Sequence, residues 1–134
     1  KAILSNTKKV VHLFDTFEGL PDSEGDFKRG DYACPMQTTL DNLKQFESHF
    51  VVYPGIFPDS LGGTDLGEFC LVHLDCDLGK SVKDGLEYFY PRLVKGGAIL
   101  IHDQPCAGVG AAVKEFFSDK PEKKQIGNYI IWKK

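Results

Sequence analysis

The stretch FCLVHLDCDL, residues 69–78, decides the fold of this chain. It is a mostly apolar run that changes abruptly to acidic residues at Asp75 and Asp77. This pattern is typical of a strand that is buried on both faces and ends at the carboxyl edge of a parallel sheet. Acidic side chains at that edge favour chemistry over packing.

Two further apolar runs end in the same way. They are VVHLF (10–14), which precedes Asp15, and AILI (98–101), which precedes His102 and Asp103. Strands that each stop at a carboxylate predict an open α/β sheet whose ligand lies beyond the strand ends.

Helical segments alternate with these strands. Apolar residues spaced three and four apart predict helices over 38–49, 81–93 and 109–118, and a short strand occupies 50–53. Residues 124–132, with Gly-Asn at their centre, predict a terminal antiparallel hairpin. The alternation predicts a mostly parallel, Rossmann-like sheet with right-handed crossovers in a single domain.

Three other segments have weaker patterns. Residues 1–9 resemble the last turns of a helix, and residues 58–61 form at most one helical turn. Residues 23–36 are polar and contain glycine and proline, which predicts a long loop of the kind that often covers a binding site.

Composition narrows the function classes. The chain has 134 residues, 42% hydrophobic and 26% charged, with a formal net charge of -3, which is typical of one globular domain. Without a basic field, we expect small-molecule rather than nucleic-acid partners. No run is long enough for a membrane span, and the four cysteines have no CxxC spacing, so we expect an unsecreted, cytoplasmic protein.

Several chemically capable residues have simple structural interpretations. Cys70, in the middle of a strand, is expected to be a small buried hydrophobe. His12 and His73 lie inside apolar strands and are expected to be hydrogen-bonded core histidines. Asp77 is expected to cap the helix that begins near Lys80.

Four segments, in this order, resemble the macrocin O-methyltransferase family. They are DTFEGLPD (15–22), YPGIFPDSL (53–61), the run from LDCDLGKSV to AILIHD (74–103), and AAVKEFF (111–117). The resemblance implies the class I methyltransferase fold, with S-adenosylmethionine as methyl donor. It also implies a sugar or other small-molecule hydroxyl as acceptor, and assistance from a divalent metal such as Mg²⁺.

The same resemblance assigns a cofactor site. It implies that Asp15 accepts hydrogen bonds from a ribose diol, and that Phe17, Gly55 and Phe57 also line the cofactor. Gly55 permits close backbone approach, and Phe57 offers a flat apolar surface for an adenine ring. A turn cap at Asp15 and a core aromatic at Phe57 are the alternatives.

The acidic strand ends predict the catalytic site. Asp75 and Asp103, at the tips of strands expected to be neighbours, would bring two carboxylates to one Mg²⁺. We expect Asp75 and His102 to be catalytic, because a base near neutral pKa takes a proton from a hydroxyl. Similar family members usually carry an acid at the position of His102, so one metal ligand is altered here. Some also place a histidine base in the loop that corresponds to 23–36, which has none in this chain.

The resemblance also predicts what this chain lacks. The first strand of the fold and its glycine-rich cofactor loop are expected before residue 1, so we expect an N-terminally truncated, partial domain over 1–134. The 10–14 strand is then expected to pair directly with the Phe69 strand, or the sheet to be completed in a homo-oligomer. The chain alone is expected to bind S-adenosylmethionine poorly.

Two alternative functions stay open at this point. The chain is also compatible with a non-catalytic remnant of the fold that acts as a binding or assembly module. A different nucleotide-binding α/β protein, such as a dehydrogenase, is disfavoured because no GxGxxG lies between a strand and a helix.

Overall fold

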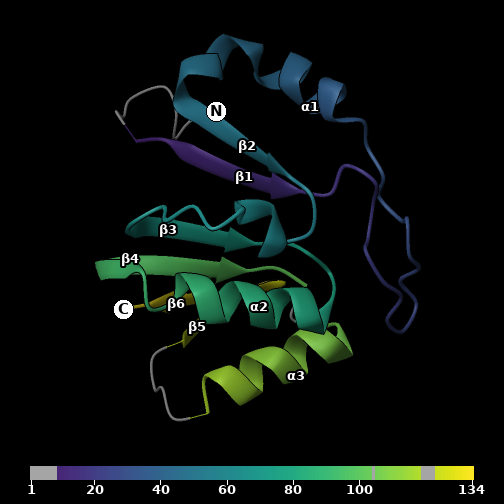
Figure 1. The fold of residues 1–134 in the computed structure, drawn as a ribbon. Helices are drawn as coiled ribbons and strands as arrows, with labels where there is room; N and C mark the ends of the chain where they lie inside the picture. The colour runs from purple at the N-terminus through teal and green to yellow at the C-terminus, as the bar shows by residue number, and fades with distance from the viewer. Residues whose placement is uncertain (1–8, 104, 119–122) are drawn as a thin grey trace.

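The computed structural model describes residues 9–103, 105–118 and 123–134 (Figure 1). The strands are β1 (Val11–Asp15), β2 (Phe50–Pro54), β3 (Phe69–Leu74), β4 (Leu93–Ile101), β5 (Lys123–Ile126) and β6 (Tyr129–Lys133). The helices are α1 (Met36–Leu43), α2 (Gly79–Phe89) and α3 (Ala107–Phe116), with 3₁₀ segments η2 (Lys44–His49) and η3 (Asp59–Leu61).

The described strands form two sheets. β1 and β2 pair in parallel, from Val11 opposite Phe50 to Asp15 opposite Pro54. The second sheet has the order β3-β4-β6-β5, in which β3 and β4 are parallel and β6 is antiparallel to both of its neighbours. Figure 1 shows the arrowheads of β1 to β4 at the same side of the molecule. The predicted α/β fold, with parallel strands and a C-terminal hairpin, is therefore confirmed.

The predicted pairing of the 10–14 strand with the Phe69 strand is wrong. Among the strands described, β1 pairs with β2, and β3 pairs with β4. Aromatic rings connect the two sheets instead: the Phe89 ring lies 5.8 Å from that of Phe14 and 5.1 Å from that of Phe57. Side-chain packing takes the place of a backbone ladder here, and completion of the sheet by a second copy stays a prediction.

The core lies between the four-stranded sheet and helices α2 and α3, which cover the same face of it (Figure 1). Its most buried side chains come from all of these elements: Val82, Leu86, Leu93, Ile99, Ile101, Val109 and Ile130. Burying each such aliphatic side chain stabilises the fold by about 1.5–3 kcal/mol before entropic costs. The helical spacing of the sequence thus produces one continuous apolar layer.

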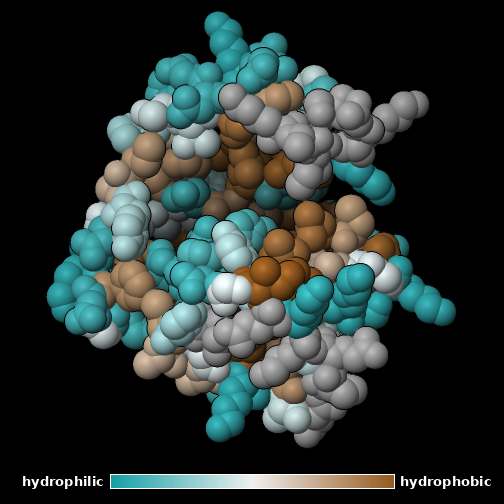
Figure 2. All heavy atoms as spheres, turned by 180° about the vertical axis from the view of Figure 1, so that it is seen from behind, coloured by the Kyte–Doolittle hydropathy of each residue, from teal (hydrophilic) through white to brown (hydrophobic). Residues whose placement is uncertain are grey.

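The prediction that residues 69–74 are buried on both faces is wrong. Val72 and Leu74 face the core, but Leu71 is 42% exposed, and Cys70 and His73 are also exposed. Leu71 and His73 alternate with Val72 and Leu74 along the strand and are exposed because α2 and α3 cover a single face. Figure 2 shows the back of the molecule, where apolar side chains gather in a hollow between its upper and lower parts.

The expectation of buried core residues is wrong for Cys70 and His73, whereas His12 is partly buried and hydrogen-bonded as expected. Cys70 and His73 are both exposed, so neither is a core residue, contrary to expectation. His12 is partly buried, and its Nδ1 lies 3.1 Å from the Tyr53 hydroxyl in a hydrogen bond, as expected.

Two helix predictions need correction at their ends. The helix expected over 81–93 ends at Phe89, because Pro91 has no backbone N–H and cannot continue a helix. Leu93 is instead the buried first residue of β4. The helix expected over 38–49 begins at Met36 as α1 and gives way to η2, in which Phe46 has non-helical φ and ψ of -122° and 17°.

The remaining segment predictions have mixed outcomes. The helix expected over 1–9 lies outside the described residues except for Lys9. Residues 23–36 are irregular up to the start of α1, apart from a short bridge between Glu24 and Phe27. The helical turn expected near 58–61 is present as η3. No helix in the described ranges has the length and apolar character that crossing a membrane requires.

Candidate functional site

Three polar side chains meet where β3 and β4 end. Leu74 and Ile101 are paired in register, and the His102 N–H donates a hydrogen bond to the Leu74 carbonyl (2.9 Å). The parallel ladder thereby continues one residue past β4 and brings Asp75 beside His102 and Asp103. One ligand atom from each of these three lies within 4.8 Å of the others.

The His102 imidazole faces both carboxylates. Its Nδ1 is 3.0 Å from Asp75 Oδ1 and 2.8 Å from Asp103 Oδ2, yet this solvent-shielded nitrogen has no hydrogen bond of good direction. The contact with Asp103, supported by the negative charge of Asp75, raises the pKa of His102, and partial burial opposes the shift. The two carboxylates therefore stabilise the protonated imidazole relative to the neutral form.

The C-terminal hairpin supplies a wall for this imidazole. The Tyr129 ring of β6 lies 4.5 Å from the His102 ring at an interplanar angle of 52°. An aromatic neighbour at this distance restricts rotation of the imidazole. The sequence did not indicate this contact, because it depends on the register of β6 against β4.

Asp77 does not cap α2, contrary to expectation. The N-cap position belongs to Leu78 and has no side-chain hydrogen bond. Asp77 instead interacts with Asp103: burial first, and then the hydrogen bond and negative charge of Asp103, raise the pKa of Asp77 to about 6. Asp77 is thus a fourth member of the acidic rim.

Glu24 performs the capping that was expected of Asp77. Its two carboxylate oxygens accept hydrogen bonds from the Gly79 N–H at 3.1 and 3.3 Å, across 55 positions of sequence. It also lies against Gly108 at the start of α3, where any Cβ would collide with its carboxylate. A negative charge at two helix N-termini is electrostatically favourable.

Asp15, Phe17 and Gly55 lie together at the end of the β1–β2 sheet. Asp15 Oδ1 accepts a hydrogen bond from the Phe17 N–H (2.8 Å), and the Asp15 carbonyl accepts one from the Gly55 N–H (2.9 Å). Phe17 has φ of 59° and Gly55 has φ of 120°. Asp15 is exposed, so its second carboxylate oxygen stays available to a ligand.

Phe57 lies in the aromatic cluster that joins the sheets. Its ring stacks on Phe89 (5.1 Å between centroids) and makes edge contacts with Phe14 and Tyr88 at 5.2 and 5.3 Å. One face of the ring is therefore covered by Phe89, so an adenine ring would have to use the other.

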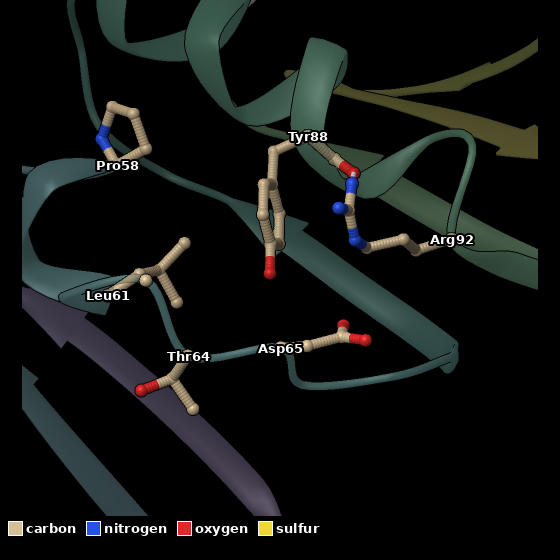
Figure 3. A pocket seen from close by; sticks show the side chains of 7 residues that line it. Pro58, Leu61, Thr64, Asp65, Tyr88 and Arg92 are labelled. Atoms are coloured by element: carbon tan, nitrogen blue, oxygen red, sulfur yellow. Dashed lines mark hydrogen bonds between the residues drawn. The ribbon is translucent and has the colours of Figure 1, made fainter.

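A second hollow lies at the opposite end of β3. It has a volume of about 280 Å³ and is lined by Pro58, Leu61, Gly63, Thr64, Asp65, Tyr88 and Arg92 (Figure 3). The Arg92 guanidinium lies 3.9 Å above the Tyr88 ring and donates a hydrogen bond to the Tyr88 carbonyl. Because the Arg92 carbonyl bonds to the first residue of β3, this hollow is separate from the carboxylate rim at the other end.

The sequence model described as Macrocin-O-methyltransferase (TylF) matches residues 2–131, nearly the whole chain. The chain belongs to the macrocin O-methyltransferase family. The resemblance drawn from its four segments is therefore confirmed.

Two curated O-methyltransferases are similar to this chain in sequence. The first is 8-demethyl-8-(2,3-dimethoxy-alpha-L-rhamnosyl)-tetracenomycin-C 4'-O-methyltransferase of Streptomyces olivaceus, 29% identical over 96% of this chain and 56% of the relative. The second is demethyldecarbamoylnovobiocin O-methyltransferase of Streptomyces niveus, 24% identical over 81% of this chain and 47% of the relative. The chain spans about half the length of both.

Two solved structures share the fold. The O-methyltransferase NovP superposes with a TM-score of 0.81 and 21% identity, over 96% of this chain and 61% of that one. The calicheamicin methyltransferase CalS11 gives 0.71 and 21%, over 92% and 60%. These likenesses establish the class I methyltransferase fold.

Proposed function

We propose that the protein transfers a methyl group from S-adenosylmethionine to a hydroxyl oxygen of a small molecule, such as a sugar hydroxyl. Family membership supports the reaction type, both curated relatives are named as O-methyltransferases, and the name of the first includes a rhamnosyl group. The observation that carries the proposal is the cluster of Asp75, His102 and Asp103 at the rim where class I folds bind their ligands.

The residues of the β1–β2 sheet are proposed to hold the methyl donor. Asp15 keeps one free carboxylate oxygen for the ribose diol, and Gly55 leaves room for close approach of the ligand to the backbone. Phe17 borders the same turn. Phe57 contributes only the face of its ring that Phe89 leaves uncovered.

In the proposed reaction the acceptor hydroxyl oxygen attacks the methyl carbon of the sulfonium. The new C–O bond forms as the C–S bond breaks, and the sulfur leaves as the neutral thioether of S-adenosylhomocysteine. The neutral His102 imidazole accepts the hydroxyl proton at Nε2, and Asp75, 3.0 Å from Nδ1, stabilises the resulting imidazolium.

A divalent cation is proposed at the same rim. Asp75 and Asp103 would hold it, and the shielded Nδ1 of His102 between them is a polar atom that still lacks a directed partner, so the donor set fits a cation. When bound, a divalent cation orients a diol and lowers the pKa of its hydroxyl.

The test is an assay with S-adenosylmethionine labelled in its methyl group and a panel of glycosides with free hydroxyls. We expect methyl ether and S-adenosylhomocysteine in equal amounts. Asp75→Asn should lower kcat/KM by about 100-fold or more, since it removes a group that acts on the proton transfer. Asp59→Asn, in η3, is the matched control and should leave the rate unchanged.

A second candidate function is a non-catalytic binding or assembly module of this fold. It is supported by the packing of Phe57, because Phe89 covers one face of the ring that was expected to bind the adenine. Micromolar binding of S-adenosylmethionine to the 134-residue chain, measured by calorimetry, would favour the enzyme. Absence of both binding and turnover would favour the module.

We also propose that the protein forms a homo-oligomer and that it is located in the reducing cytoplasm. Leu71, 42% exposed on the uncovered sheet face, supports contact with a second copy. All four cysteines are free thiols, which supports the location. Sedimentation equilibrium tests the first point, and a monomer at high micromolar concentration would contradict it.

A further inference from the structure

We propose that His102 makes the rim a site for a borderline transition cation, of the class of Mn²⁺, Co²⁺ and Zn²⁺, in preference to Mg²⁺. Asp75, His102 and Asp103 are its three protein ligands. The inference rests on the proposed function, since it concerns the same site, and it changes one role there: in the cation-loaded protein His102 coordinates instead of accepting the proton.

The spacing of the donor atoms suits coordination. The His102 Nδ1 lies 3.0 and 2.8 Å from the two carboxylate oxygens, and all three donors lie within 4.8 Å of one another. Two ligands on one cation are at most about 4.2 Å apart when each bond is about 2.1 Å long. Small side-chain rotations at the strand ends are enough to close the set around a cation.

The surroundings of the imidazole Nδ1 also support coordination of a cation. The Nδ1 atom is shielded from solvent, and neither of its two carboxylate contacts has the direction of a hydrogen bond. A shielded polar atom without a directed partner is rare in folded proteins. A cation between the carboxylates would use the lone pair of a neutral imidazole.

The chemistry of the three donor atoms determines which cation the site prefers. Mg²⁺ takes oxygen ligands in near-ideal octahedral geometry, whereas imidazole nitrogen suits the transition metals. Compared with a site of three aspartates, His102 also removes one negative charge, which weakens attraction for a hard cation that depends on charge.

The position of the ring is set by its neighbours. The Tyr129 ring, 4.5 Å from the imidazole, limits its rotation, and the hydrogen bond from the His102 N–H to Leu74 fixes its backbone. The imidazole is therefore held toward the two carboxylates before any ligand arrives, which lowers the cost of binding.

The experiment is calorimetric titration of the protein with MnCl₂, ZnCl₂ and MgCl₂. We expect Mn²⁺ and Zn²⁺ to bind at least about 10-fold more tightly than Mg²⁺, as expected for a mixed nitrogen and oxygen site. His102→Asp should narrow or reverse this preference. His49→Gln, at a partly buried histidine beside Ser48 and outside the rim, is the matched control and should leave this preference unchanged. Electron spin-echo spectra of the Mn²⁺-loaded protein should contain a ¹⁴N coupling that His102→Asp removes.

The outcomes separate this inference from the proposed function. Tight Mg²⁺ binding that equals Mn²⁺ binding, with no ¹⁴N coupling, would overturn the selectivity and leave a metal-assisted enzyme intact. Binding of none of the three cations would overturn both the inference and the proposed metal. If His102→Asp does not fold, as judged by near-UV circular dichroism, His102→Asn serves instead and should weaken Mn²⁺ and Zn²⁺ more than Mg²⁺.

Discussion

At the scale of single residues, the rim depends on two aspartates with left-handed backbone. Asp77 has φ of 59° and Asp103 has φ of 54°. This conformation costs a residue with a Cβ about 1–2 kcal/mol, and aspartate is among the side chains that adopt it most readily. Each follows a strand end within three residues and turns the chain sharply, so that the two carboxylates approach each other. The local strain is part of what concentrates negative charge at the rim.

His12 gives the stability of the protein a pH dependence. Burial lowers the pKa of His12 below its ordinary value of 6.5. Between the folded-state pKa and 6.5 the unfolded chain binds more protons than the native protein, so the free energy of unfolding falls as the pH falls through this window. His12→Gln should flatten that part of the profile in urea denaturation between pH 5 and 8.

His49→Gln is the control for this measurement and should retain the wild-type slope. A His12→Gln profile that runs parallel to the wild-type profile would show that another group is responsible.

At the scale of elements, α2 and α3 begin side by side and share one acid. A Cβ on Gly79 would lie 2.6 Å from the Gly108 carbonyl oxygen, so only glycine permits this approach. Glu24 fills the space next to both helix starts. The irregular segment after β1 is thereby attached to the helical layer at its first turn.

Removing this cap should destabilise the protein measurably. Glu24→Gln keeps the shape but loses the charge, and we expect a loss of about 0.5–2 kcal/mol in the free energy of unfolding. Gly108→Ala should displace the Glu24 carboxylate and give a loss of similar size. Adding Gly108→Ala to Glu24→Ala should then cost little more, which urea denaturation of the double variant would measure.

Glu68→Gln is the surface control and should change the stability by less than about 0.5 kcal/mol. Fully additive losses in the double variant would mean that Gly108 and Glu24 act separately.

The strands β1, β3 and β4 were predictable because their apolar runs stop at Asp15, Asp75 and His102-Asp103, and each strand ends within one residue of the expectation. The meeting of Asp75, His102 and Asp103 followed from the rule that parallel neighbours end at one edge. By contrast, Glu24 acts across 55 positions, and nothing in a polar loop marks such a contact. The exposure of Leu71 was missed because an apolar run does not reveal how many layers cover it.

At the scale of the whole molecule, the two sheets are unequal partners. Apart from Leu20 and Leu61, the buried hydrophobic side chains of the described residues fall between Val72 and Trp132, within the β3-β4-β6-β5 sheet, α2, α3 and the segments that join them. The β1–β2 sheet attaches to this body through aromatic rings, of which Phe89 contacts the largest number.

Phe89→Ala should therefore loosen one sheet selectively. Together with a loss of about 3–5 kcal/mol in stability, we expect faster amide hydrogen exchange throughout β1 and β2. Phe117→Ala is the matched control: Phe117 is equally buried, at 6% exposed, but stacks on Trp132 at the far side of the core. It should cost similar stability without the selective effect on β1 and β2, and equal exchange patterns in both variants would contradict this division.

The aromatic joint between the sheets has a mechanical consequence. The separation of Asp75 from Asp103 is fixed by a backbone ladder, which cannot lengthen without breaking hydrogen bonds. The separation of Asp15 from Asp75 depends on aromatic rings such as Phe14, Phe57 and Phe89, which can shift relative to one another without breaking a hydrogen bond. A ligand that contacts both sheets therefore binds two carboxylates at a fixed separation, Asp75 and Asp103. The length of the ligand itself then determines how far Asp15 lies from Asp75.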